Sequence, residues 1–300
     1  MENNNKKQPI RQLIDRETGE LIDIFEGDRV QIISRKQNSA IKHSIKGKEL
    51  NEEIKYWNEE LGGFIFVLFK YCDLILNEHP EIKPEDITKL FYLATYVDYN
   101  GNLIYNNRYM TKECMMELLH IKQRQFDTFF KKMKDSEIFL YKNKTIKINT
   151  NYFIKGEITK EIQLHSGYTR LYINAIRFLY DNVKITKHHQ LGMYFKLIPY
   201  IHRQKNVLCH NPDSYESDIK LMNVKELKEK IGYHRNGIRK FINELLSTKL
   251  KNGESILVSV RNDPDEGKSY IIFNPRIFYG GNFNIQEGKT AIMKCFKTIN

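Results

Sequence analysis

Cysteine and long apolar runs are scarce in this 300-residue sequence. Its 4 cysteines lie far apart without a Cys-x-x-Cys pair, which argues against a disulfide scaffold and a zinc finger: Cys72, Cys114, Cys209 and Cys295. The longest apolar run, Phe64–Phe69, is much shorter than the ~18–20 residues that cross a bilayer. Met1–Pro9 is too polar for a secretory signal. We therefore expect a soluble, cytoplasmic protein that does not bind membranes.

Common catalytic motifs are also missing. No Gly-x-x-x-x-Gly-Lys-Ser/Thr loop is present, so an ATPase is not indicated. His188 and His189 are adjacent, whereas the metal-binding pair of a rolling-circle nuclease is separated by an apolar residue. His202, Cys209 and His210 lack a credible fourth ligand for zinc. We expect no enzymatic activity, no cofactor and no metal.

Positive charge, by contrast, is abundant: the net charge is +11 and the pI is about 9.2. Residues 61–156 carry 14 Lys+Arg and 11 Asp+Glu, a net charge of +3, and residues 165–281 carry 19 and 11, a net charge of +8. An AT-rich genome also yields a chain rich in Lys, so the location of the charge is more informative than its total. Because basic surfaces attract polyanions, these two stretches are candidates for binding nucleic acid.

The two basic stretches resemble each other in sequence, which indicates an internal duplication. Four blocks recur in the same order. The first two blocks repeat at a lag of 104 residues, the third at 112 and the last at 125: residues 63–68 and 167–172, 91–97 and 195–201, 115–133 and 227–245, and 148–156 and 273–281. Shared helical periodicity would not also repeat the last block, which contains Asn-x-x-x-Phe-x-x-Gly.

Each copy is expected to contain helices followed by a β-hairpin. In the first copy the pattern predicts helices at Leu61–Leu76, Ile87–Val97, Thr111–His120 and Gln123–Met133, and strands at Ile138–Lys142 and Thr145–Asn149. In the second it predicts helices at Tyr168–Asn182, Leu191–His202, Val224–Ile231 and Arg235–Leu246, and strands at Ile256–Val260 and Ser269–Asn274. Thr111 and Asn223 are the expected N-caps.

This order is typical of the winged helix-turn-helix. We predict a mainly α protein with small β-hairpins (α+β), in which two such domains are arranged in tandem. The expected parts are residues 1–60 (N-terminal hairpin and basic linker), 61–156 (first winged-helix domain), 165–281 (second winged-helix domain) and 282–300 (C-terminal tail).

A recognition helix needs an apolar face toward its own domain and a polar face toward the major groove. In the first copy the apolar face is expected at Phe126, Phe129, Phe130 and Met133. The DNA-binding candidates there, including the wing lysine, are Lys122, Gln123, Arg124, Gln125, Thr128, Lys131, Lys132 and Lys144. Arg can read guanine, Gln can read adenine and Lys can neutralise phosphate. Polar residues on a helix are also typical of any solvated face, so polarity alone does not decide.

The second copy predicts an analogous helix, seated by Ile238, Phe241, Ile242 and Leu245. Its DNA-binding candidates, including two residues of the wing, are His234, Arg235, Asn236, Arg239, Lys240, Asn243, Arg261 and Lys268. Because the outward residues differ between the copies, the two half-sites need not be identical.

The segment Asn274–Gly281, which reads Asn-Pro-x-x-Phe-x-x-Gly, resembles the closing element of RepL-type plasmid and phage replication proteins. Asn149–Gly156 has Thr150 where that element has proline. The resemblance implies a winged helix and binding at a replication origin, although the family usually has one module and this chain has two. The partners expected are double-stranded DNA and, in addition, host replication proteins or a second copy of the chain. A phage transcriptional regulator would use the same domains, and a protein–protein adaptor is the alternative without DNA.

The N-terminal segment is expected to be an arm. Ile14–Phe25 is predicted to form a β-hairpin that turns at Thr18-Gly19, and Val30–Ser44 is a basic stretch. Three roles remain open for it: contact with the minor groove, a solvated linker, and contact with another subunit or with the replication machinery.

Overall fold

A computed structural model of the chain describes residues 11–14, 21–24, 59–69, 79–142, 145–159, 162, 167–223, 226–227, 237–261, 269–280, 292 and 294–296. The chain divides into two compact units, residues 1–52 and 53–300, and both copies lie in the second unit. The fold is mixed α+β, with helices and small antiparallel sheets. None of the described helices has the length and hydrophobicity needed to cross a bilayer.

The first unit contains an antiparallel β-hairpin. β1 (Arg11–Ile14) pairs with β2 (Leu21–Ile24), so that Ile14 lies opposite Leu21. The predicted hairpin is confirmed, and its first strand begins earlier than expected. The predicted turn at Thr18-Gly19 and the basic stretch Val30–Ser44 lie outside the described residues.

A four-stranded antiparallel sheet lies at the centre of the second unit. Its order is β12-β9-β3-β8, formed by β12 (Phe278–Tyr279), β9 (Tyr168–Tyr172), β3 (Phe64–Leu68) and β8 (Phe153–Ile154). Each copy contributes one inner strand and one outer strand.

Two helix predictions were wrong at this sheet. The predicted helix Leu61–Leu76 contains β3, and its residues 70–76 lie outside the described part of the chain. The predicted helix Tyr168–Asn182 begins with β9, and its remaining residues form the helix α7 (Ile173–Asn182). Both strands are buried along most of their length. A strand that is buried on both faces is a continuous apolar run, which periodicity alone cannot distinguish from a buried helix.

The register of this sheet is equivalent in the two copies. The inner strands pair with each other, and Phe66 lies opposite Arg170, its counterpart at the 104-residue lag. Phe66 also lies opposite Ile154 of its own copy, while Arg170 lies opposite Tyr279. Ile154 and Tyr279 are themselves counterparts at the 125-residue lag. The sequence repeat therefore corresponds to a repeat in three dimensions.

The rest of the first copy follows the predicted order with shifted boundaries. Its elements are α3 (Pro84–Ala94), β4 (Ile104–Tyr105), β5 (Arg108–Tyr109), α4 (Lys112–Leu119), α5 (Gln123–Asp135), β6 (Phe139–Lys142) and β7 (Thr145–Ile148). α3 begins earlier than predicted because Pro84 occupies its first turn and the Asp86 carboxylate accepts a hydrogen bond from the Lys83 backbone N–H at 3.2 Å.

The described elements of the second copy include counterparts of α3, α5, β6 and β7 in the same order, and most of the segment that corresponds to α4 lies outside the described residues. Its elements are η1 (Ile185–Lys187), α8 (His188–Phe195), η2 (Ile198–Tyr200), η3 (Glu216–Asp218), α10 (Ile238–Ser247), β10 (Leu257–Arg261) and β11 (Ser269–Phe273). The prediction of one helix over Leu191–His202 was wrong at its C-terminal end, because η2 follows α8 and Ile201 bridges to Leu208. Asn223 and Glu226 each accept a hydrogen bond from the other's backbone N–H, as expected of an N-cap.

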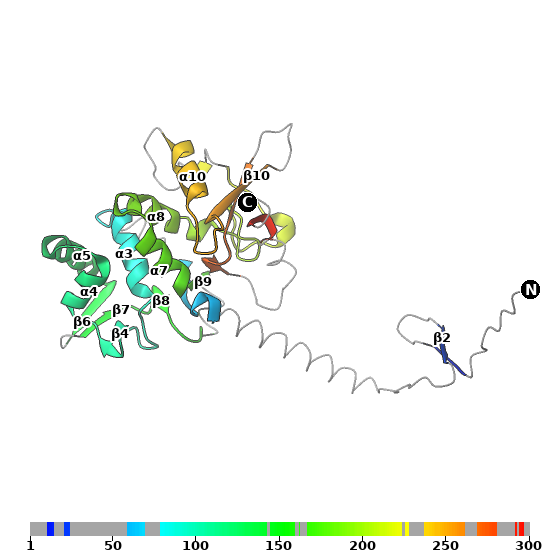
Figure 1. Cartoon of the computed structure of the whole chain (residues 1–300), viewed down its shortest axis with the longest axis horizontal. Helices are drawn as coiled ribbons and strands as arrows, with labels where there is room; N and C mark the ends of the chain where they lie inside the picture. The colour runs from blue at the N-terminus through cyan, green and yellow to red at the C-terminus, as the bar shows by residue number, and fades with distance from the viewer. Residues whose placement is uncertain are drawn as a thin grey trace, which may run out of the picture. The chain divides into compact units, whose positions relative to one another are not determined.

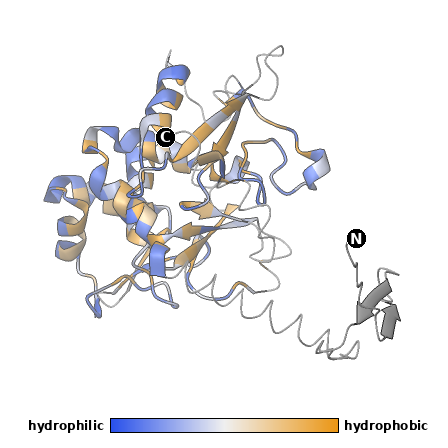
Figure 2. Ribbon diagram, turned by 45° about the vertical axis from the view of Figure 1, so that its right-hand side comes forward, coloured by the Kyte–Doolittle hydropathy of each residue, from blue (hydrophilic) through white to orange (hydrophobic). Residues whose placement is uncertain are grey.

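Helices α3 and α8 are counterparts, and they pack directly against each other (Figure 1). The rings of Phe91 and Phe195 stack at 4.5 Å with an interplanar angle of 7°. A Cβ at Gly192 would lie 1.8 Å from the Pro84 carbonyl oxygen, so the backbones meet there. Thr88, the counterpart of Gly192, donates a hydrogen bond from its hydroxyl to the His188 carbonyl at 2.7 Å. One hydrophobic core thus extends through both copies, with apolar residues on the inward sides of the helices (Figure 2).

The repeated Asn-x-x-x-Phe-x-x-Gly element closes each hairpin onto the central sheet. Asn149 accepts a hydrogen bond on its side-chain oxygen from the Asn151 backbone at 3.0 Å, and Asn274 accepts one from Arg276 at 2.9 Å. Tyr152 and Ile277, the next counterparts, accept backbone hydrogen bonds from the two inner strands. The element is therefore a turn that delivers β8 and β12 to the sheet.

Candidate nucleic-acid interface

A tight turn joins α4 to α5. The Thr111 side chain accepts a hydrogen bond from the Cys114 backbone N–H at 3.2 Å, which confirms the predicted N-cap of α4. α4 ends at His120, whose φ of 53° and ψ of 40° lie in the left-handed region. Lys122 then donates its backbone N–H to the Gln125 side chain at 3.4 Å and begins α5. The predicted start of α5 is confirmed.

The apolar face of α5 is fully seated in the core of the first copy. Its four predicted residues are buried: Phe126, Phe129, Phe130 and Met133. The Phe129 ring meets Phe139 of β6 edge to face at 5.8 Å, which ties the helix to the hairpin. Burial of side chains of this size stabilises the packing of α5 against its own copy by about 1.5–3 kcal/mol each. This packing fixes the direction in which the polar face of α5 points.

The polar face of α5 is exposed to solvent. The exposed predicted residues, with Lys122 at the N-cap, are Lys122, Gln123, Arg124, Gln125, Thr128 and Lys131. At ~100° per residue, Arg124, Thr128 and Lys131 point away from the buried face. The Gln123 side-chain amide donates to Asp127 at 2.9 Å. The helix extends beyond the predicted end to Asp135, an exposed acid that falls on this same outward side.

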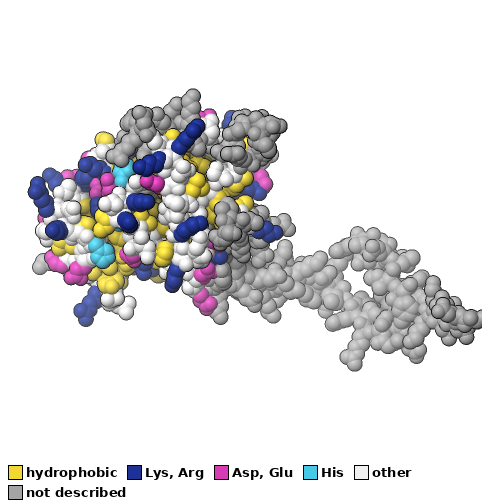
Figure 3. Space-filling model, turned by 45° about the horizontal axis from the view of Figure 1, so that its top comes forward, with side chains coloured by type: hydrophobic (Ala, Val, Ile, Leu, Met, Phe, Trp, Pro, Cys, Tyr) yellow, Lys and Arg dark blue, Asp and Glu magenta, His cyan; other side chains and the backbone are white. Residues whose placement is uncertain are grey.

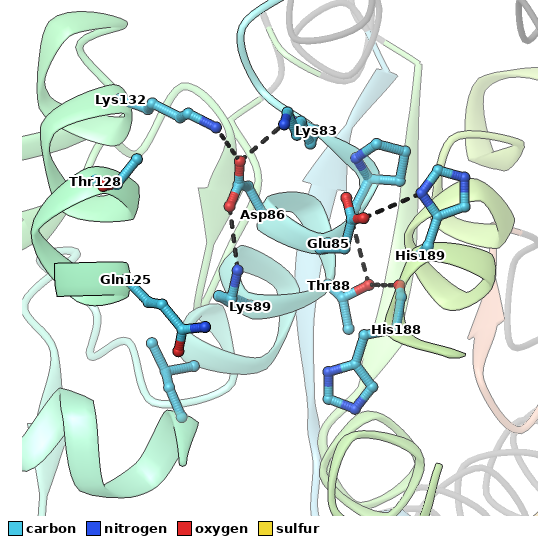
Figure 4. A network of polar contacts seen from close by, with 12 residues as sticks. Lys83, Glu85, Asp86, Thr88, Lys89, Gln125, Thr128, Lys132, His188 and His189 are labelled. Atoms are coloured by element: carbon cyan, nitrogen blue, oxygen red, sulfur yellow. Dashed lines mark hydrogen bonds and ion pairs between the residues drawn. The ribbon is translucent and has the colours of Figure 1, made fainter. Parts of the chain in front are cut away.

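Lys132 differs from these residues because its ammonium is committed to an ion pair. Its Nζ lies 2.7 Å from Oδ2 of Asp86, and the Nζ of Lys89 lies 3.1 Å from Oδ1 of the same carboxylate (Figure 4). Burial raises the pKa of Asp86, but the hydrogen bond from Lys132 and the charge of Lys89 outweigh it, so the pKa is lowered. This contact holds α5 against α3.

A groove of about 580 Å³ runs beside α5. Its lining comes from α3, the α4–α5 turn, α5, and the region from α7 to α8, and includes Lys89, His120, Arg124, Gln125, Thr128, Tyr180, Ile185 and His188. The Tyr180 hydroxyl donates to the Leu119 carbonyl at 2.9 Å. The second copy thus supports the turn before α5 in the first copy.

Two exposed lysines near this groove were missed by the sequence analysis. Lys184 and Lys187 lie on either side of the groove residue Ile185, on the turn that precedes α8. In the sequence that segment is an ordinary connection between helices, and only its place in the groove that α5 also lines identifies it. Seen from one side, Lys and Arg side chains are spread over the surface with Asp and Glu among them (Figure 3).

In the second copy α10 has the same division into two faces. Phe241, Ile242 and Leu245 are buried, whereas Arg239, Lys240 and Asn243 are exposed. Glu244 accepts a hydrogen bond from the Gln190 side-chain amide of α8 at 3.2 Å. Glu244 and Gln190 are the counterparts of Lys132 and Asp86. Each helix is therefore attached at the equivalent position, α5 by an ion pair and α10 by a hydrogen bond.

The remaining predicted DNA contacts lie outside what the structure describes. They are Lys144, His234, Arg235, Asn236 and Lys268, together with the side chain of Arg261, whose backbone ends β10. The two hairpins that would serve as wings are confirmed as antiparallel pairs, with Leu140 opposite Lys147 in the first and Ser259 opposite Ile271 in the second.

The candidate zinc ligands have structural contacts instead. His202 is buried; its Nε2 lies 3.0 Å from the Ser214 carbonyl oxygen and its Nδ1 accepts from the Lys205 backbone at 3.2 Å. Burial raises the pKa of the Cys209 thiol to about 11. Within the described ranges, no three His, Cys, Asp or Glu side chains form a group that could hold a metal ion.

Comparison of the chain with protein-family models, with curated proteins and with solved structures gave no match.

Proposed function

We propose that this chain is a sequence-specific double-stranded DNA-binding protein with two tandem winged helix-turn-helix modules, residues 61–156 and 165–281. The observation that carries the proposal is the division of α5 into two faces. Its apolar residues are buried, and Arg124, Thr128 and Lys131 are exposed on the opposite side. Such a helix can enter a major groove without disturbing the core that positions it.

The N-terminal half of α5 is the part that we assign to the base edges. Gln123 and Arg124 lie in its first turn, where recognition helices usually contact bases, and Arg pairs bidentately with guanine. At the other end Asp135 would be repelled by phosphates. Lys132 is held by Asp86, so we assign it to positioning of the helix.

The second module is proposed to act in the same way through α10, with Arg239, Lys240 and Asn243 exposed. Since the modules are covalently joined, engagement of the second becomes intramolecular. This effect can tighten binding by ~10²–10⁴ when the geometry permits both contacts.

The biological role that we propose is initiation of plasmid or phage replication. The support is the RepL-like element Asn274–Gly281, which here closes the second hairpin onto the sheet. A transcriptional regulator is the alternative. The location of the site separates the two, because an initiator binds at an origin or within its own gene, and a regulator binds at a promoter.

The test of DNA binding is a titration of labelled duplexes, followed by fluorescence anisotropy. Affinity should fall by ~10³ or more between about 50 and 200 mM salt if six or more phosphates are contacted. Arg124→Ala should cost about 1–3 kcal/mol and relax specificity at one base pair, whereas Lys131→Ala should weaken all sites alike.

Lys220→Ala is the matched control, since Lys220 is exposed but lies outside both helices and both hairpins. Its affinity should equal that of the unmodified chain. Absent or salt-insensitive binding would contradict the proposal and favour a protein–protein adaptor.

A further inference from the structure

Three residues of the first copy touch their own counterparts in the second copy. Phe66 pairs with Arg170 in the sheet, the rings of Phe91 and Phe195 stack at 4.5 Å, and Oε1 of Glu85 lies 3.3 Å from Nδ1 of His189. All three pairs are related by the same lag of 104 residues. When two copies are related by a two-fold rotation, residues that lie on the axis touch their own counterparts, and they do so at several points along the axis. A translation from one copy to the next would not bring counterparts together in this way.

Reciprocal contacts on either side support the same axis. Phe69 donates its backbone N–H to the Gly167 carbonyl at 2.6 Å, and their counterparts, Ile173 and Gly63, make the equivalent bond at 3.1 Å. The antiparallel pairing of β3 with β9 has this symmetry as well. The two copies are thus related by an approximate two-fold rotation.

Both candidate recognition helices lie near the same end of this axis. α5 is tied to Asp86, the neighbour of Glu85 on α3, and α10 is tied to Gln190, the neighbour of His189 on α8. The contact between Glu85 and His189 therefore lies between the two attachment points. Figure 4 shows α5, α3 and α8 side by side at this end.

We propose that the DNA site of this chain is an imperfect inverted repeat, with one half read by α5 and the other by α10. The inference rests on the proposed function. Two helices related by a two-fold axis meet the two strands of a duplex in opposite directions, so the site mirrors the symmetry of the protein. A direct repeat would require copies related by translation along the DNA.

The two halves differ because the outward residues differ. Thr128 and Lys131 of α5 correspond to Lys240 and Asn243 of α10, and all four are exposed. Different side chains read different bases, so the chain binds its site in one orientation only. A symmetric dimer, by contrast, would bind its site equally well in either orientation.

The experiment begins with selection of bound duplexes from a random pool by the full-length chain. The recovered site is then compared with a duplex in which one half is reversed to form a direct repeat, and with one that carries about 5 extra base pairs at the centre, half a helical turn. Both changes should weaken binding at least ~10-fold, because they remove one of two linked contacts.

Footprints of two variants test the assignment of the halves. Arg124→Ala should lose protection in one half of the site, and Lys240→Ala in the other half. Equal affinity for the inverted and direct arrangements would overturn the inverted repeat and leave DNA binding intact. Failure to select any duplex would instead remove the proposed function.

Discussion

The two copies share a scaffold but differ in their polar chemistry. Both deliver an outer strand to the central sheet in equivalent register, and both close their hairpins with an asparagine turn. At the attachment of the candidate recognition helix, however, the first copy has the ion pair of Asp86 with Lys132, and the second has a hydrogen bond between Gln190 and Glu244.

The closing element differs in the same way. In the second copy Arg276 is buried and its Nε lies 3.1 Å from Oε2 of Glu254, with a further ion pair to Glu60. Its counterpart Asn151 is exposed and carries no charge. Backbone pairing and the asparagine turns are retained, whereas the polar side chains around them have diverged, including buried ones such as Asp86 and Arg276. Substitutions in the packed rings therefore test the shared scaffold, and substitutions of the polar side chains test the part in which the copies differ.

The largest expected effect concerns the shared scaffold. Phe91→Ala and Phe195→Ala each remove a buried ring from the contact between the copies, so each should lower the free energy of unfolding by about 3–5 kcal/mol. Urea denaturation followed by circular dichroism measures this. Since the rings stack on each other, the double variant should lose less than the sum of the two.

The copies should also unfold in one transition, because one core extends through both. Tyr99→Ala is the control: this ring is 74% exposed and its loss should change the stability by no more than about 0.5 kcal/mol. Two separate transitions, one for each copy, would contradict the shared scaffold.

The second effect concerns the attachment of the helix, where the copies differ. Asp86→Asn should lower the free energy of unfolding by about 1–2 kcal/mol at pH 7, because two lysines lose a charged partner. Gln190→Ala should cost less, about 0.5–1 kcal/mol, because one hydrogen bond is lost. Equal losses in the free energy of unfolding would show that the ion pair stabilises the attachment of α5 no more than the amide hydrogen bond stabilises that of α10.

The pH dependence of Asp86→Asn has a definite sign. The pKa of Asp86 is lowered in the folded chain, so its contribution is present above the ordinary value of 3.8 and is lost as the pH falls below it. Thermal unfolding curves of the variant and the unmodified chain should therefore differ at pH 7 and converge below about pH 4. A constant difference across this range would exclude the ion pair as the cause.

Sequence patterns predicted the local elements better than the contacts between them. The start of α5 follows from its apolar periodicity, and the start of α4 follows from the cap at Thr111; both are local signals. The strands β3 and β9 were predicted as helices because both are buried runs. The tie from Asp86 to Lys132 joins residues 46 positions apart, and no spacing rule detects it.

The relation between the copies has the same physical limit. A lag of 104 residues shows that two segments are similar, but rotation and translation produce the same lag. Only contacts such as that between Phe91 and Phe195 distinguish the two. The exposure of Arg124, Thr128 and Lys131 was predicted correctly, since the apolar face determines the polar one, whereas Lys132 is partly buried in its ion pair with Asp86.

The smallest expected effect concerns the exposed end of the axis. Glu85→Gln removes a carboxylate whose side chain is 41% exposed and whose partner His189 is 27% exposed, so the stability should change by less than about 0.5 kcal/mol. Comparison with Phe91→Ala tests whether the contacts between counterpart residues stabilise the fold through burial of apolar surface. If Glu85→Gln instead cost as much as the loss of the ring, measured in the same urea titration, polar contact and not packing would hold the copies together.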